Sequence, residues 1–232
     1  VIDGHCEASQ IEAGGDVIIR KGCQGKGLGK IIAGKSIVGQ FFESAVLTAG
    51  KDVQATYLLN CQLKANGKLL VEGRKGVIIG GKTCAKLGVS CNGIGNIAEI
   101  ATVVSVGIDK EDMTAYQELQ KKIEQTQAEL QTCENGLNKL MANPVHDEKV
   151  SMMIQRLTRA VYTLKSSRKE LFSERNAQME QMTKQKEARI QVSGRAYPGT
   201  LLFLNEDPFA IKEIYNNVEF VKHDNRIDTL AH

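Results

Sequence analysis

The chain has 232 residues, of which 42% are hydrophobic, so it is long enough to build a sizeable buried core. Its formal net charge is only +3, it contains no Trp, and aromatic residues make up 5%. This balance argues against a nucleic-acid or membrane-surface binder, which usually carries a basic block, and against a platform of aromatic side chains on which bases stack. No run reaches the roughly 18 apolar residues of a membrane span.

One short unit repeats along the first part of the chain: apolar residues two apart, a small residue, a glycine turn and a second apolar strand. The small residue recurs after 20, 16, 16 and 14 residues, at Ala13, Ala33, Ala49, Ala65 and Ile79. Apolar residues two apart on both sides of a turn indicate strands. A strand unit at a nearly constant period predicts a right-handed parallel β-helix over residues 1–108, with rungs about 4.8 Å apart.

The turn of each repeat holds glycine or asparagine, the residues that most readily adopt positive φ. We interpret this column as one left-handed corner that recurs on every rung. The predicted structural turn column is Gly14, Gly34, Gly50, Asn66 and Gly80. Beyond the repeats, β-branched residues predict two more strands, at 97–100 and 102–107.

Strand periodicity gives way to helix periodicity at Asp109. Two long heptad patterns, separated by Asn143 and Pro144, predict an antiparallel coiled-coil hairpin inserted at 109–187. The predicted coiled-coil seam is Leu119, Ile123, Leu130, Leu137, Leu157, Val161 and Leu164. The repeat pattern then returns, so residues 188–232 are expected to rejoin the β-helix and cap its end. The predicted fold class is mainly β with an α insertion.

This order of parts resembles the flagellar assembly protein A family. The resemblance rests on the turns AGGD at 13–16 and AGKD at 49–52, the VGID step at 106–109, the hairpin, and SGRAYPGT at 193–200. It covers nearly the whole chain and implies a cytoplasmic bacterial protein that takes part in flagellar assembly. It also implies protein partners, with flagellar or cell-pole proteins and a homo-oligomer as the open choices, and no catalytic residues. The family's separate N-terminal domain does not occur in this sequence, which begins at Val1 in the middle of a rung and therefore reads as a fragment.

Two segments match the phosphate-binding pattern G-x-x-x-x-G-K-[ST], at 29–36 and 76–83, with Lys35 and Lys82 as the lysines. That chemistry needs a helix directly after the lysine, so that backbone N–H groups face the phosphates. Strand-forming residues follow the first match instead, in register with repeats that lack the motif. A nucleotide-binding protein is therefore the second alternative function.

Asp16 and Asp52 occupy one turn position two rungs apart, or roughly 9.6 Å at the usual strand spacing. Two carboxylates near this separation can work as acid and base in an inverting glycosidase, so a carbohydrate-active β-helix enzyme is the first alternative. Asp also favours turns, and Lys68 and Lys82 continue the column, which favours a solvated corner.

The remaining candidate groups form no recognisable site. Among the six cysteines there is no CxxC pair and no disulfide framework, so free thiols in a reducing compartment are expected. His5, beside Asp3 and Cys6, lacks a partner cluster for a metal, and the other histidines are His146, His223 and His232. The sequence thus predicts a non-enzymatic structural or scaffold protein without catalytic, cofactor or metal residues, acting through protein–protein interaction.

Overall fold

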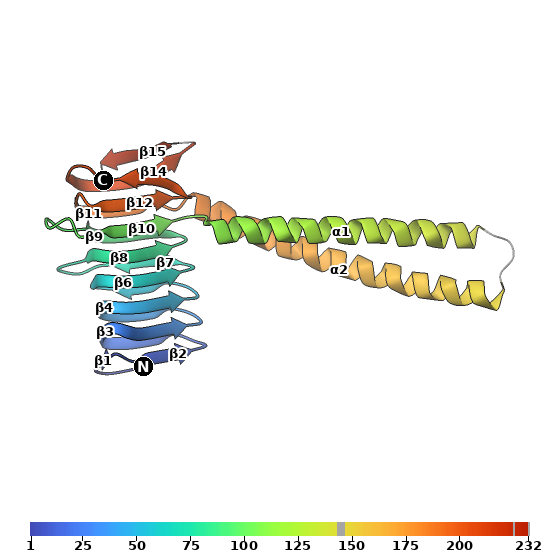
Figure 1. The fold of residues 1–232 in the computed structure, drawn as a ribbon, viewed down its shortest axis with the longest axis horizontal. Helices are drawn as coiled ribbons and strands as arrows, with labels where there is room; N and C mark the ends of the chain where they lie inside the picture. The colour runs from blue at the N-terminus through green and yellow to red at the C-terminus, as the bar shows by residue number, and fades with distance from the viewer. Residues whose placement is uncertain (143–146, 225, 232) are drawn as a thin grey trace. The chain divides into compact units, whose positions relative to one another are not determined.

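The computed structural model describes residues 1–142, 147–224 and 226–231. Its contacts divide the chain into two compact units. Unit 1 comprises Val1–Asp109 and Met182–His232, and unit 2 comprises Lys110–Gln181. Unit 1 is a β-solenoid of about five turns, and the inserted unit consists of two long helices (Figure 1). The predicted fold class, mainly β with an α insertion, is confirmed.

The solenoid is built from strands that pair in parallel from one turn to the next. Before the helices these strands are β1 His5–Glu7, β2 Gln10–Ala13, β3 Val17–Ala33, β4 Ile37–Ala49, β5 Val53–Ala55, β6 Tyr57–Ala65, β7 Lys68–Val71, β8 Val77–Ala85, β9 Gly88–Ile94 and β10 Thr102–Val106. After the helices, β11 Ile190–Ala196 pairs in parallel with β9, and β12 Thr200–Leu204 pairs in parallel with β10. The chain therefore re-enters the solenoid on the turn directly above the one it left.

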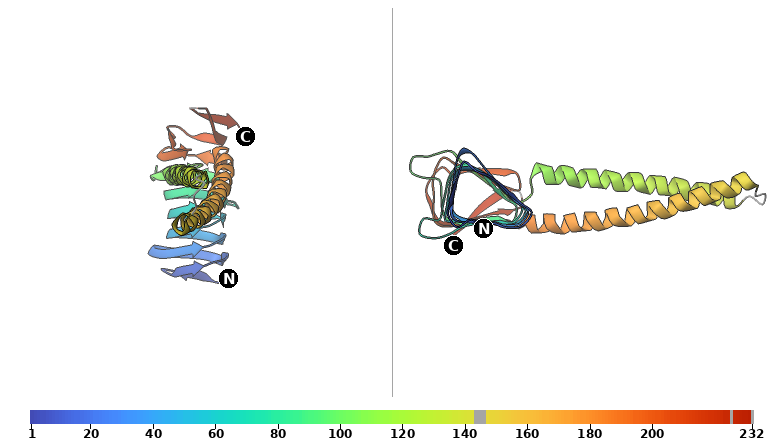
Figure 2. Two further views of the ribbon diagram at one scale, coloured as in Figure 1. Left: turned by 90° about the vertical axis from the view of Figure 1, so that its right-hand side faces the viewer. Right: turned by 90° about the horizontal axis from the view of Figure 1, so that it is seen from below.

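Each turn has three sides, which Figure 2 shows as a triangle when the solenoid is viewed along its axis. Strands β3 and β4 accordingly pair in three blocks, which begin at Val17 with Ile37, Gly22 with Phe41, and Gly29 with Ala45. Alternate side chains point inward and stack into apolar columns, each large member contributing about 1.5–3 kcal/mol through burial. One column on the third side is Ile11, Ile31, Leu47, Leu63, Thr83, Val104 and Leu202.

The predicted register is wrong at the fifth repeat. Ala65 pairs with Ala85, so Ala85 occupies the place that was predicted for Ile79. Ile79 pairs instead with Leu59, on the second side of the triangle. Apolar alternation has the same period on all three sides, so the pattern identified a strand and assigned it to the wrong side.

The strand predicted at 97–100 is also wrong. These residues form a turn, in which the side-chain oxygen of Asn96 accepts a hydrogen bond of 3.2 Å from the backbone N of Ile100. The carbonyl oxygen of Asn96 accepts a second bond, of 3.0 Å, from the backbone N of Glu99. Asn96 thus forms local hydrogen bonds with the backbone of this segment, and these bonds stabilise a turn instead of a strand.

Antiparallel strands close the C-terminal end of the solenoid. They are β13 Asp207–Ala210 on β12, β14 Tyr215–His223 on β11, and β15 Arg226–Ala231 on β14. Phe209, Tyr215 and Phe220 form an aromatic cluster there, with ring centroids 5.5 to 6.3 Å apart. Phe220 is fully buried, so this cluster covers apolar surface that the last turn would otherwise expose.

Unit 2 contains all of α1 (Lys110–Met141) and most of α2 (Glu148–Lys186). The helices are antiparallel, since Glu134 lies 2.8 Å from Lys165 and the earlier Gln127 accepts a 2.9 Å hydrogen bond from the later Arg168. Leu119, Ile123, Leu130 and Val161 of the predicted seam are buried; Leu137, Leu157 and Leu164 are half-buried. Regular coiled-coil packing stays a prediction, and the break at Asn143 and Pro144 lies outside the described residues.

Candidate functional site

Neither phosphate-binding match has the helix that a nucleotide site requires. The first match runs from β3 through a turn into β4, and the second lies along β8. Lys35 and Lys82 are exposed, whereas the side chain of Thr83, which would face the magnesium ion, is buried inside the solenoid. This geometry does not cradle a phosphate group.

Asp16 and Asp52 each cap the backbone of the following turn. Ser36 N donates a hydrogen bond of 2.9 Å to Asp16 Oδ1, and Lys68 N donates one of 2.7 Å to Asp52 Oδ1. A carboxylate that accepts a backbone N–H at a corner joins two rungs with a charge-assisted bond. Both carboxylates are exposed as well, which favours a structural role over an acid and base pair.

The predicted turn column has two errors, in its conformation and in its last member. Of the predicted members, only Gly80 has a positive φ, at 69°. Gly80 lies within β8 rather than at the corner. The corner above Asn66 belongs to Lys86, whose backbone N donates to the carbonyl oxygen of Ala65.

Glycine is needed at positions 34 and 50 of this column because these corners lie very close to the corner beneath. A Cβ atom built on Gly34 would lie 2.3 Å from the carbonyl oxygen of Gly14. Real Cβ atoms do not approach backbone atoms this closely, so any side chain would push the two rungs apart. Gly34 and Gly50 are therefore selected for the absence of a side chain.

The cysteines and histidines form no reactive or metal-binding cluster in the part of the chain that the structure describes. All six thiols are free, and burial raises the pKa of Cys91 to about 12 and that of Cys23 to about 11. Such thiols stay protonated and therefore unreactive near neutral pH. The candidate histidines His146 and His232 lie outside the described residues. Within the described ranges, neither helix is apolar enough to cross a membrane.

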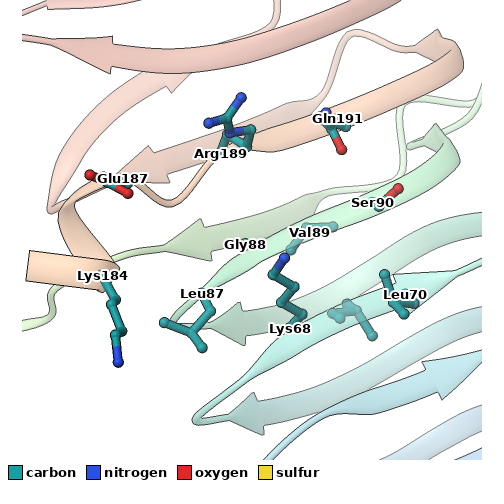
Figure 3. A pocket seen from close by; sticks show the side chains of 11 residues that line it. Lys68, Leu70, Leu87, Gly88, Val89, Ser90, Lys184, Glu187, Arg189 and Gln191 are labelled. Atoms are coloured by element: carbon teal, nitrogen blue, oxygen red, sulfur yellow. The ribbon is translucent and has the colours of Figure 1, made fainter. Parts of the chain in front are cut away.

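A groove of about 550 Å³ opens on the first side of the solenoid (Figure 3). It lies where the outward residues of β9 are small: Gly88 has no side chain, and Ser90 carries only a hydroxymethyl group. Longer side chains stand on the neighbouring rungs, with Lys68 beside Gly88, and Leu70 and Gln191 on either side of Ser90. The groove is thus a notch left by two small residues, and every residue that lines it belongs to unit 1.

Charged groups surround this notch. Besides Lys68, its lining includes Lys184 from the last turn of α2, Glu187 and Arg189. Arg189 Nη1 lies 3.1 Å from Glu219 Oε1, and Gln191 Nε2 donates to the same oxygen at 3.1 Å. Glu219 therefore holds two of the lining groups in place.

The family model described as the flagellar assembly protein A beta solenoid domain matches residues 1–227. The chain belongs to this family. The resemblance seen in the AGGD, AGKD and SGRAYPGT segments is therefore confirmed, and family membership implies a role in flagellar assembly. Neither the curated proteins nor the solved structures compared with the chain give a match.

Sequence reasoning missed the groove of this flagellar assembly protein A solenoid. Gly88 and Arg189 lie on adjacent rungs, but the inserted helices separate them in the sequence. The sequence indicates the notch only once the register is corrected. The residues that begin the first side of successive turns are then Asp16, Ser36, Asp52, Lys68 and Gly88. A glycine among residues with side chains then marks a notch.

Proposed function

We propose that this protein is a non-enzymatic scaffold for bacterial flagellar assembly that acts in the cytoplasm through contacts with other proteins. The observation that carries the proposal is the family match, which spans the solenoid and the inserted helices together. The geometry is consistent with it, because Asp16 and Asp52 bind backbone groups and Lys35 and Lys82 are exposed lysines on strands and turns. These were the groups on which an enzymatic or nucleotide-binding function would have depended.

The inserted helices are the part of the scaffold that we assign to partner binding. Three large side chains of α2 are exposed, Met152 at 50%, Met153 at 55% and Tyr162 at 78%. Exposed methionine and aromatic side chains are typical of binding surfaces, because methionine adapts to different partners and tyrosine combines apolar area with a hydroxyl group. A flagellar protein or a second copy of the chain are the two kinds of partner that this surface would take.

The proposal is tested by affinity purification from the native cell, followed by identification of the bound proteins. Flagellar assembly proteins should be recovered with the whole chain and lost with a variant carrying Met152→Ser, Met153→Ser and Tyr162→Ser. A matched control replaces exposed lysines of the solenoid instead, with Lys35→Ala and Lys51→Ala. Normal flagella in cells that lack the protein would contradict the role in assembly. Equal recovery by all variants would contradict the assignment to α2.

A further inference from the structure

We propose that the groove between β7 and β11 is a docking site for an acidic segment of a partner protein. This inference rests on the proposed function only in taking the partner to be a protein. It adds a second binding surface, on the solenoid itself, and states the chemistry that this surface recognises.

The charges of the groove favour an anionic ligand. Lys68, Lys184 and Arg189 line it together with the carboxylate of Glu187, and Glu219 beside the lining pairs with Arg189, so three cations stand against two carboxylates. Among the described residues Lys68 Nζ takes part in no ion pair, and Figure 3 shows its side chain extending towards the Gly88 and Val89 rung. A carboxylate placed over Gly88 would therefore meet an ammonium group that has no partner of its own, in a charge-assisted hydrogen bond.

Arg189 on the opposite wall is already ion-paired, and Figure 3 shows its guanidinium on the side of the strand away from the Gly88 rung. Glu219 is only 13% exposed and binds one nitrogen of Arg189 and the amide nitrogen of Gln191. A guanidinium group carries five N–H donors, so this contact leaves donors for a second carboxylate.

Shape and apolar area distinguish a peptide from other anions. The volume of about 550 Å³ exceeds what one inorganic anion fills, and Leu70 and Leu87 supply half-buried apolar walls. None of the described residues that line the groove is aromatic, so these residues lack the stacking surface that single-stranded nucleic acids use. An apolar residue between acidic residues matches this combination of apolar walls and cations.

The test measures binding of two fluorescein-labelled peptides to the whole chain at low salt by fluorescence anisotropy. The acidic probe is Ser-Glu-Leu-Glu-Ser, and its matched control is Ser-Gln-Leu-Gln-Ser. The acidic peptide should bind and the neutral one should not. Lys68→Gln should weaken binding about tenfold through the loss of one charge-assisted bond. Its backbone N–H still bonds Asp52, so the corner is retained.

Two further variants separate the groove from general surface charge. Ser90→Phe fills the notch without changing any charge and should weaken binding as strongly as Lys68→Gln does. Lys51→Gln removes a lysine outside the groove lining and should bind like the unmodified chain. Circular dichroism verifies that every variant keeps the solenoid.

Three results would overturn the proposal: equal binding of both peptides, no effect of Ser90→Phe, or displacement of the peptide by an equally charged single-stranded oligonucleotide that binds as tightly. The last result would make the groove a general anion surface. These outcomes are independent of the cellular test above. If the protein is required for flagella but its groove does not bind the acidic peptide, only this inference is refuted and the proposed function stands.

Discussion

Gly50 lies directly over Gly34, so closely that a Cβ atom on Gly50 would sit 2.2 Å from the carbonyl oxygen of Gly34. Gly50→Ala should therefore lower the free energy of unfolding by about 2 kcal/mol, because the rungs must separate to admit the methyl group. Gly14→Ala is the matched control, since a Cβ at Gly14 would meet no atom of the described residues within 4 Å. Urea denaturation compares the two variants. Equal losses of stability would show that backbone conformation, rather than stacking, selects glycine here.

Asp52 should act as a corner cap and not as a catalytic group. Asp52→Ala removes the acceptor for Lys68 N and should cost about 1 kcal/mol, whereas Asp52→Asn keeps an acceptor oxygen and should recover most of that loss. Denaturation curves measure the difference. The opposite result would be that the unmodified chain hydrolyses a polysaccharide and Asp52→Asn abolishes this activity. That result would support the carbohydrate-active enzyme instead.

Lys35 and Lys82 should be dispensable. Calorimetric titration of the whole chain with Mg²⁺ and ATP or GTP should show no binding, because both lysines lie outside a strand–loop–helix phosphate site. Lys35→Ala and Lys82→Ala should unfold like the unmodified chain, within about 0.5 kcal/mol. Nucleotide binding that either substitution abolished would reverse this conclusion.

The inserted helices should be removable without loss of the solenoid. Asn205 binds the chain both where it leaves the solenoid and where it returns. Asn205 Oδ1 accepts a hydrogen bond of 2.9 Å from Ile108 N, and Asn205 Nδ2 donates one of 3.2 Å to Lys186 O. Excision of Lys110–Gln181, with a short Gly/Ser linker in its place, keeps both bonds. Far-ultraviolet circular dichroism should lose most helical signal and retain one cooperative β transition.

A longer excision, from 111 to 186, serves as the contrast to this variant. It also removes Gln185, which is 7% exposed within the solenoid unit, so it should be less stable than the shorter excision. An unfolded or insoluble product from the shorter excision would mean that the two units share a core, and that the predicted domain division is wrong.

Cys91 should make the protein less stable in alkali. Burial raises the pKa of this thiol from its ordinary value of 9.0 to about 12 in the folded chain. Between these values the unfolded chain gives up a proton that the folded chain keeps, so stability is full below about pH 9 and falls as the pH rises towards 12. Denaturation of Cys91→Ala at several pH values checks this, because the variant should lose less stability with rising pH. Parallel pH curves would contradict it.

Local patterns in the sequence were sufficient to predict which kinds of element form. Apolar residues two apart predicted the solenoid strands. The heptads from Leu119 to Leu137 and from Leu157 to Leu164 predicted the helices α1 and α2. These patterns depend only on how a strand or helix exposes its faces, so they can be read before any pairing is known. The small residues at the corners were recognised for the same reason.

Tertiary structure alone decided which residues meet across the rungs. The second phosphate-binding match falls along β8 and not at a corner because Ala65 pairs with Ala85, and no local pattern separates that register from one that starts at Ile79. The reason for glycine at position 34 appeared only when the carbonyl of Gly14 was found directly beneath it. The groove has the same origin: Lys68, Gly88 and Arg189 become neighbours through backbone hydrogen bonds between turns, and those bonds carry no signature in the order of the side chains.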